Sequence, residues 1–164
     1  MATGDIKILE QASMTGRGAR KYNVAAGATT INPGEPVARA LGGVVVTAMA
    51  TSKPVAGTDY LVGIAATTST QTAGVAGYVY VYPLTEQTTY LIKPYDTTLW
   101  DTQAEYNALV GSVVLIDLSA TTGIYTILST SDTTNNGCVI LPLDITKYPG
   151  RVAFAFRSVI SDLK

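Results

Sequence analysis

The chain has 164 residues, of which 47% are hydrophobic and only 14% are charged, and its formal net charge is −1. This length suits one compact domain with a core of its own. The near-zero charge gives no general attraction to nucleic acid or to an anionic membrane, no apolar run is long enough to span one, and the N-terminus lacks the layout of a secretory signal. We therefore expect a protein made in the cytoplasm, without nucleic-acid or membrane partners.

Residues 1–22 are predicted to form an extended N-terminal arm of low intrinsic order, preceding a β-rich body at 23–164. The stretch IKILEQ (6–11) is briefly strand-like, and the stretch after it carries two glycines and a basic cluster, Arg17, Arg20 and Lys21. Such a cluster on an arm is either solvated or pairs with an acidic protein surface. We take these three residues as candidates for anchoring the arm to a partner.

After the arm, short apolar or alternating runs separated by turn residues predict a mainly β fold, a barrel or a sandwich. Gly42-Gly43 fits a two-residue hairpin loop, and SVVLIDL and IYTILST fit a second hairpin with a longer loop. The expected strands cover 22–26, 36–41, 44–48, 60–67, 78–84, 88–93, 112–118, 124–129, 138–142 and 151–158.

The stretch GYVYVYP (77–83) alternates tyrosine with valine. Side chains of a strand alternate between its two faces, so Tyr78, Tyr80 and Tyr82 share one face while the valines share the other, core-facing one. The tyrosine face is either a half-exposed aromatic row that stabilises the sheet or a contact with another subunit. We take the three tyrosines as candidates for a subunit interface.

One short helix is predicted near 103–110. Thr102 and Glu105 match a capping box, in which each side chain satisfies a backbone N–H at the start of the helix, and Gly111 supplies a left-handed stop. The helix should cover an end or a flank of the β body.

The sequence offers no catalytic constellation, metal site or cofactor site. Histidine is absent and the one cysteine, Cys138, lies in an apolar run, so the common nucleophile systems and a structural zinc site are excluded. Asp96, Asp101 and Glu105 surround Trp100 and raise the possibility of a glycosidase, but capping explains Glu105 and a helix N-terminus favours Asp101. We therefore expect no enzyme.

Several segments together resemble the small head proteins of tailed bacteriophages that decorate or cement the capsid. They are GATTINPGEPVARA, DYLVGIAATTST, DTQAEYNALVGSVVLIDLS, IYTILSTSDTTNNG and CVILPLDITKYPGRVAFAFRS, and the similarity spans most of residues 22–158. It implies a β-rich body, frequently a homotrimer, that sits on the capsid exterior and bridges neighbouring copies of the major capsid protein.

Two alternatives stay open from the sequence. One is a carbohydrate-binding or adhesion module of the virion, with Tyr95, Trp100 and Tyr106 as an aromatic platform for sugar. The other is a structural component of the tail or neck of the same virion. Neither the virus and its host, nor the copy number and symmetry axis, nor what the exposed side binds can be predicted from these residues.

Overall fold

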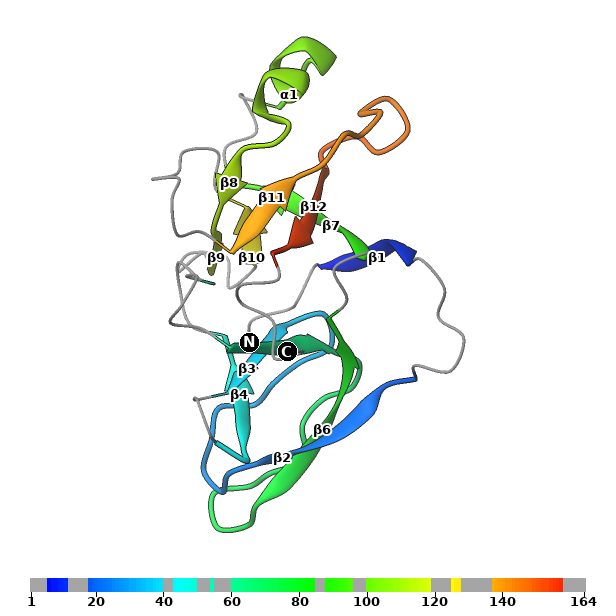
Figure 1. The fold of residues 1–164 in the computed structure, drawn as a ribbon. Helices are drawn as coiled ribbons and strands as arrows, with labels where there is room; N and C mark the ends of the chain where they lie inside the picture. Colours follow the sequence, from blue (N-terminus) through cyan, green and yellow to red (C-terminus); the bar gives the residue numbers. More distant parts are fainter. Residues whose placement is uncertain are drawn as a thin grey trace.

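The computed structural model consists of two β-sheets, each curled around its own core, with one helix at the far end of the larger sheet (Figure 1). It describes residues 6–11, 18–39, 43–49, 54, 60–84, 88–95, 100–118, 125–127 and 137–157. The prediction of a mainly β chain with a barrel-like sheet and one short helix is confirmed over these residues.

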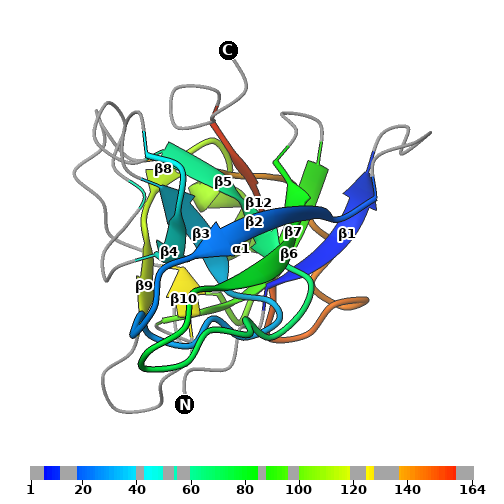
Figure 2. The ribbon, with the colours of Figure 1, turned by 90° about the horizontal axis from the view of Figure 1, so that it is seen from below.

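The smaller sheet has five strands in the order β2-β6-β5-β3-β4. An isolated bridge between Asn23 and Val45 joins its two outer strands, so the sheet curls around a core rich in valine (Figure 2). Its strands are β2 (Arg20–Val24), β3 (Pro36–Arg39), β4 (Val46–Ala48), β5 (Tyr60–Ala65) and β6 (Gly77–Pro83).

The larger sheet has the order β8-β11-β12-β7-β10-β9, with β1 added beside β7. Its end strands β8 and β9 are consecutive in the chain and separated by Leu115 alone, so one bent segment closes the sheet into a nearly complete barrel. Its strands are β1 (Lys7–Gln11), β7 (Thr88–Pro94), β8 (Val113–Val114), β9 (Ile116–Leu118), β10 (Tyr125–Ile127), β11 (Cys138–Ile140) and β12 (Val152–Phe156).

Both predicted strand pairs are present. Strands β3 and β4 pair antiparallel with Arg39 opposite Val46, and the predicted two-residue loop at 42–43 lies partly outside the described residues, which omit 40–42. Strands β9 and β10 form the second hairpin, with Tyr125 opposite Leu118.

The described parts of the predicted arm belong to the two sheets. Strand β1 pairs with β7 and strand β2 pairs with β6, so the predicted boundary at residue 22 falls inside β2. The segments are extended, as expected. Their backbone N–H and C=O groups bond to neighbouring strands, whereas those of an unattached arm would bond to water. Arg17 lies outside the described residues.

Helix α1 (Gln103–Leu109) has the capping box and the stop that the sequence predicts. The Glu105 amide donates to Thr102 Oγ1 (3.3 Å), the Thr102 amide donates to Glu105 Oε2 (3.2 Å), and Gly111 has a φ of 86°. Tyr106 points from the helix into the larger core, where its hydroxyl donates to the Leu141 carbonyl (2.7 Å) and accepts from the Ala153 amide (3.0 Å). The helix therefore covers an end of the larger barrel, as predicted.

Strand β5 connects the two cores. Leu61 and Ile64 pack in the larger core, while Val62 and Ala65 pack in the smaller one. A β-bulge makes this possible, because Val37 pairs with Gly63 and the next residue, Ala38, pairs with Leu61, which leaves Val62 as the extra residue.

We predict that Gly63→Ala destabilises the fold. A Cβ atom at this position would overlap the Tyr82 carbonyl oxygen and lie 2.7 Å from Val81 Cγ1, so β5 and β6 would have to separate. Overpacking of this kind costs about 1–3 kcal/mol in the free energy of unfolding, measurable by urea denaturation. Gly74→Ala is the matched control, since a Cβ there meets nothing within 4 Å. Equal effects of the two substitutions would contradict the close approach at Gly63.

Candidate interaction surface

The outer face of β6 carries the predicted row of tyrosines. Val79 and Val81 are fully buried in the smaller core, whereas Tyr80 and Tyr82 keep 38% and 37% of their surface exposed and Tyr78 is half-buried. The alternation read from GYVYVYP is therefore confirmed. We call Lys21, Tyr78, Tyr80 and Tyr82 the tyrosine face.

Lys21 belongs to this face because β2 lies beside β6. In the antiparallel register Lys21 is opposite Tyr80 and Asn23 is opposite Tyr78. The Lys21 Nζ atom lies 4.1 Å from the centre of the Tyr78 ring, a cation–π contact. The Tyr78 and Tyr80 rings meet edge to face at 5.7 Å. The structure thus joins one of the predicted anchoring residues to the predicted interface tyrosines.

Arg20 is exposed on the same strand, with Val81 as its cross-strand partner. Its place in a paired strand fixes its backbone, so Arg20 and Lys21 are presented by the sheet and not by a free arm. Of the three basic candidates, the structure therefore brings Lys21 onto the tyrosine face, while Arg20, opposite Val81, belongs to the other face of β2.

The backbone of β6 is paired on both sides. Strand β2 lies along one edge, and strand β5 followed by the segment 66–70 lies along the other. In that segment the Thr67 and Thr70 hydroxyls accept from the Tyr80 and Tyr78 amides at 3.2 and 3.0 Å, and the Ala66 amide donates to the Tyr80 carbonyl at 2.7 Å. A partner on this face must therefore be held by side chains and not by adding a strand to β6.

A groove of about 410 Å³ opens beside Tyr82, at the end of the tyrosine face. Its lining comes from four separate segments of the chain, and it consists of Ile6, Lys7, Pro33, Gly34, Ile64, Ala65, Ala66 and Tyr82. The sequence analysis missed this groove, because no local pattern shows that these segments meet. Among its lining residues, Tyr82 alone was predicted as part of an interface.

The wall of the groove at Pro33 and Gly34 is a turn held by a buried carboxylate. Gly34 has a φ of 81° and the Glu35 amide donates to the Asn32 carbonyl (3.1 Å), the geometry of a type II turn. The buried Glu35 side chain accepts from the Asn32 amide at 2.9 Å and from Asn32 Nδ2 at 3.2 Å. Burial raises the pKa of Glu35 above its ordinary value, and the two hydrogen bonds from Asn32 oppose that shift.

The aromatic platform suggested for sugar does not form. Trp100 is 4% exposed and Tyr106 is fully buried, with their rings packed edge to face at 5.7 Å inside the larger core, while Tyr95 is 60% exposed. Tyr106 is buried because the amphipathic helix turns its large apolar residue toward the core, and Trp100, which precedes the helix, packs against it there. The prediction of a joint platform of Tyr95, Trp100 and Tyr106 is therefore wrong.

Of the two acidic residues near Trp100 that the structure describes, Glu105 belongs to the capping box and Asp101 lies just before it. The pKa of Glu105 is lowered mainly by its hydrogen bond from the Thr102 hydroxyl. The pKa of Asp101 is raised mainly by a hydrogen bond with Glu105 and, second, by the negative charge of Glu105. Both groups are exposed to solvent and Asp96 lies outside the described residues. The interpretation of Glu105 as a helix cap is confirmed.

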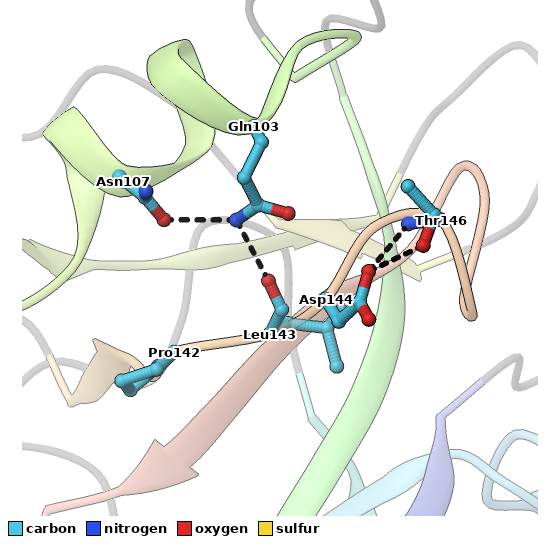
Figure 3. A pocket seen from close by; sticks show the side chains of 6 residues that line it. All are labelled: Gln103, Asn107, Pro142, Leu143, Asp144 and Thr146. Atoms are coloured by element: carbon cyan, nitrogen blue, oxygen red, sulfur yellow. Dashed lines mark hydrogen bonds between the residues drawn. The ribbon is translucent and has the colours of Figure 1, made fainter.

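A second hollow, about 620 Å³ and open to solvent, lies between α1 and the segment 142–146 (Figure 3). The Gln103 side chain crosses it, donating from Nε2 to Asn107 Oδ1 (2.8 Å) and to the Leu143 carbonyl (2.9 Å). Asp144 Oδ1 accepts from the amide and the hydroxyl of Thr146 at 3.0 and 2.6 Å. These polar groups hold the helix to the segment, so the hollow is a structural junction.

Cys138 is fully buried in the larger core, as expected of a small hydrophobic residue, and burial raises the pKa of its thiol. Within the described parts of the chain, no group of three or more acidic or cysteine side chains could hold a metal ion. None of the helices formed by those same residues is long and apolar enough to cross a membrane.

Comparison of the chain with models of protein families, with curated proteins and with solved structures finds no match.

We predict that Glu35 makes the fold less stable as the pH rises from acid toward neutral. Above pH 4.5 the unfolded chain loses this proton first, because the pKa of Glu35 is raised only in the folded state. The free energy of unfolding of the wild type should therefore fall relative to Glu35→Gln as the pH rises from 4.5 through the folded pKa. Urea denaturation between pH 4 and 7 measures the difference.

Glu105→Gln is the matched control for this titration. The pKa of Glu105 is lowered in the folded state, so its contribution is present above pH 4.5 and is lost as the pH falls through the folded pKa. The wild type should thus gain stability relative to Glu105→Gln as the pH rises to 4.5 and stay level above it, where it loses stability relative to Glu35→Gln. The same trend for both variants would refute the assignment for Glu35.

Proposed function

We propose that this protein is a non-enzymatic structural protein of a phage virion, which binds the outside of the assembled capsid and stabilises it by bridging neighbouring copies of the major capsid protein. Its resemblance to capsid decoration proteins suggests this role and suggests a homotrimer. The chain would be made in the host cytoplasm and would function on the capsid exterior.

The tyrosine face is the observation that carries the proposal. It exposes two aromatic rings and a lysine on a sheet whose backbone is already paired, next to an open groove. Tyrosine is enriched at protein interfaces because its ring covers apolar area while its hydroxyl keeps a hydrogen bond. Such a face is suited to contact with another protein, either a second copy of the chain or a capsid subunit.

The mechanism we infer is thermodynamic. A protein that binds the assembled lattice and not the separate subunits stabilises the lattice by mass action, by roughly 2.7 kcal/mol per site at a hundredfold excess over its dissociation constant. A trimer that touches several capsid subunits at once would strengthen this effect through effective concentration. A sparsely charged surface agrees with such a role, since charged residues are depleted at the centres of interfaces.

For the case in which a second copy of the chain covers the tyrosine face, we predict that Tyr80→Ala weakens self-association of the chain. The substitution removes an exposed ring that packs edge to face on Tyr78 without touching the valines of the core. Size-exclusion chromatography with light scattering should show a trimer for the wild type at micromolar concentration and a shift toward monomer for the variant. Tyr95→Ala is the matched control, since Tyr95 is an exposed tyrosine that follows β7 in the larger sheet and is not part of the tyrosine face. A monomeric wild type, or an unchanged variant, would remove the tyrosine face from the subunit interface.

We predict that the protein sediments with expanded empty capsids of its phage but does not bind unassembled capsid subunits. Bound protein should also raise the temperature at which the capsids melt, because it binds only the assembled state. Deleting residues 1–21 is not a clean test, since it removes β1 and the start of β2. Equal binding to free subunits would contradict the mechanism, and immunogold labelling at the tail or neck would place the protein in another part of the virion.

A further inference from the structure

The tyrosine face and the groove beside it form one continuous strip, because Tyr82 belongs to both. Tyr78 and Tyr82 are four residues apart on β6, so their Cα atoms are separated by about 13 Å. Lys21 lies over the ring at one end of this strip, and Lys7 lines the groove at the other end.

We propose that this strip binds an extended acidic segment of a partner protein, in which two carboxylates flank an apolar residue. The inference deepens the proposed function and rests on it for the identity of the partner, an extended segment of a capsid subunit. It assigns the tyrosine face to the capsid and not to a second copy, so a trimer that Tyr80→Ala dissociates would contradict it. The carboxylates would pair with Lys21 and Lys7, and the apolar residue would enter the groove.

Charge decides the chemistry of the occupant. The residues that form the strip include two lysines and no acidic residue, and Glu35 of the adjoining turn is buried and bonded to Asn32. A second copy that presented the same strip would bring lysine against lysine, which is repulsive. A segment that carries carboxylates is attracted to the strip at both ends.

The shape of the groove decides the size of the occupant. Its volume falls within the range of about 300–1,000 Å³ typical of ligand pockets. Ile64 and Ala65 give it an apolar lining, with Pro33 on one side and the ring of Tyr82 on another. These surfaces suit aliphatic side chains or proline, one or a few at a time, and not a folded domain.

The state of the β6 backbone decides how the segment is held. Since β2, β5 and the segment 66–70 already pair with β6, the occupant adds no strand to the sheet. An extended or polyproline segment lying across a row of aromatic rings is held by side-chain contacts, the mode used by domains that bind proline-rich peptides. In such a segment, residues four apart span about the same distance as Tyr78 and Tyr82.

The test is an NMR titration of the isotopically labelled full chain with three synthetic peptides. The acidic probe is Ac-Ser-Glu-Thr-Val-Pro-Glu-Ser-NH2, in which proline keeps the preceding valine extended. One control replaces both glutamates with lysine, and the other replaces valine with serine. We expect the acidic probe alone to shift the resonances of Lys7, Lys21 and the tyrosines of the strip, and the shifts to shrink as salt is added.

Variants of the protein separate the two parts of the site. Lys21→Gln should weaken binding of the acidic probe by about two- to fivefold, as for an exposed ion pair, and Tyr82→Ala should weaken it by about tenfold or more. Lys147→Gln and Tyr95→Ala change an exposed lysine beside Asp144 and an exposed tyrosine, neither of which lines the strip, and should leave binding unchanged. Circular dichroism of each variant confirms that the fold is retained.

If the acidic probe at millimolar concentration shifts these resonances no more than the lysine probe does, the inference is wrong. It is also wrong if the shifts map to the hollow beside Gln103. Peptide binding in a protein that fails to sediment with capsids would refute the proposed function and leave the acidic-segment site standing. Sedimentation with capsids that is insensitive to an excess of a binding probe would support the proposed function and place the capsid contact elsewhere.

Discussion

The close approach of β6 to β5 at Gly63 is the contact on which the exposed surface of the smaller sheet depends. Gly63 pairs with Pro83 and leaves no room for a Cβ atom against the Tyr82 carbonyl. Because side chains alternate along β6, fixing this one pair fixes the whole register, with the valines inside and the tyrosines outside. If the register slipped by one residue, the three tyrosine side chains would point into the smaller core, whose buried side chains are all aliphatic.

Burial of β5 on both sides extends this constraint to the groove. The bulge at Val62 lets Leu61 and Ile64 face the larger core while Val62 and Ala65 face the smaller one. Ile64 therefore lies where the two barrels meet, opposite Tyr82 in the β-ladder. The groove forms there because the turn at Pro33 and the start of β1 approach the same point from the two sheets.

Local features of the sequence predicted the local structure well. The alternation of GYVYVYP assigned each side chain of β6 to its face, and the capping box at Thr102 and Glu105 located the helix. These signals succeed because strand alternation and helix capping depend only on residues close together in the chain.

Features that depend on contacts between distant segments were not predictable in the same way. The sequence could not show that Lys21 lies over Tyr78, because that contact follows from the pairing of β2 with β6. The burial of Trp100 and Tyr106 was not predictable either, since aromatic residues of a core and of a binding surface have the same sequence signature. Within residues 1–22, the described segments of the predicted arm pair as strands with β7 and β6. The sequence did not predict this pairing, because pairing between distant strands leaves little local signature.

The choice of tyrosine and lysine for this face bears on how a free chain could carry the proposed contact surface without aggregating. A row of leucines would bury more apolar area per contact but would leave a patch that promotes aggregation of the free chain. Tyrosine keeps a hydroxyl for water, and the contact with Tyr78 holds Lys21 in place before any partner arrives. Less side-chain entropy is then lost on binding. Each such contact is weak by itself, so strong attachment requires many copies engaged at once, as on a lattice.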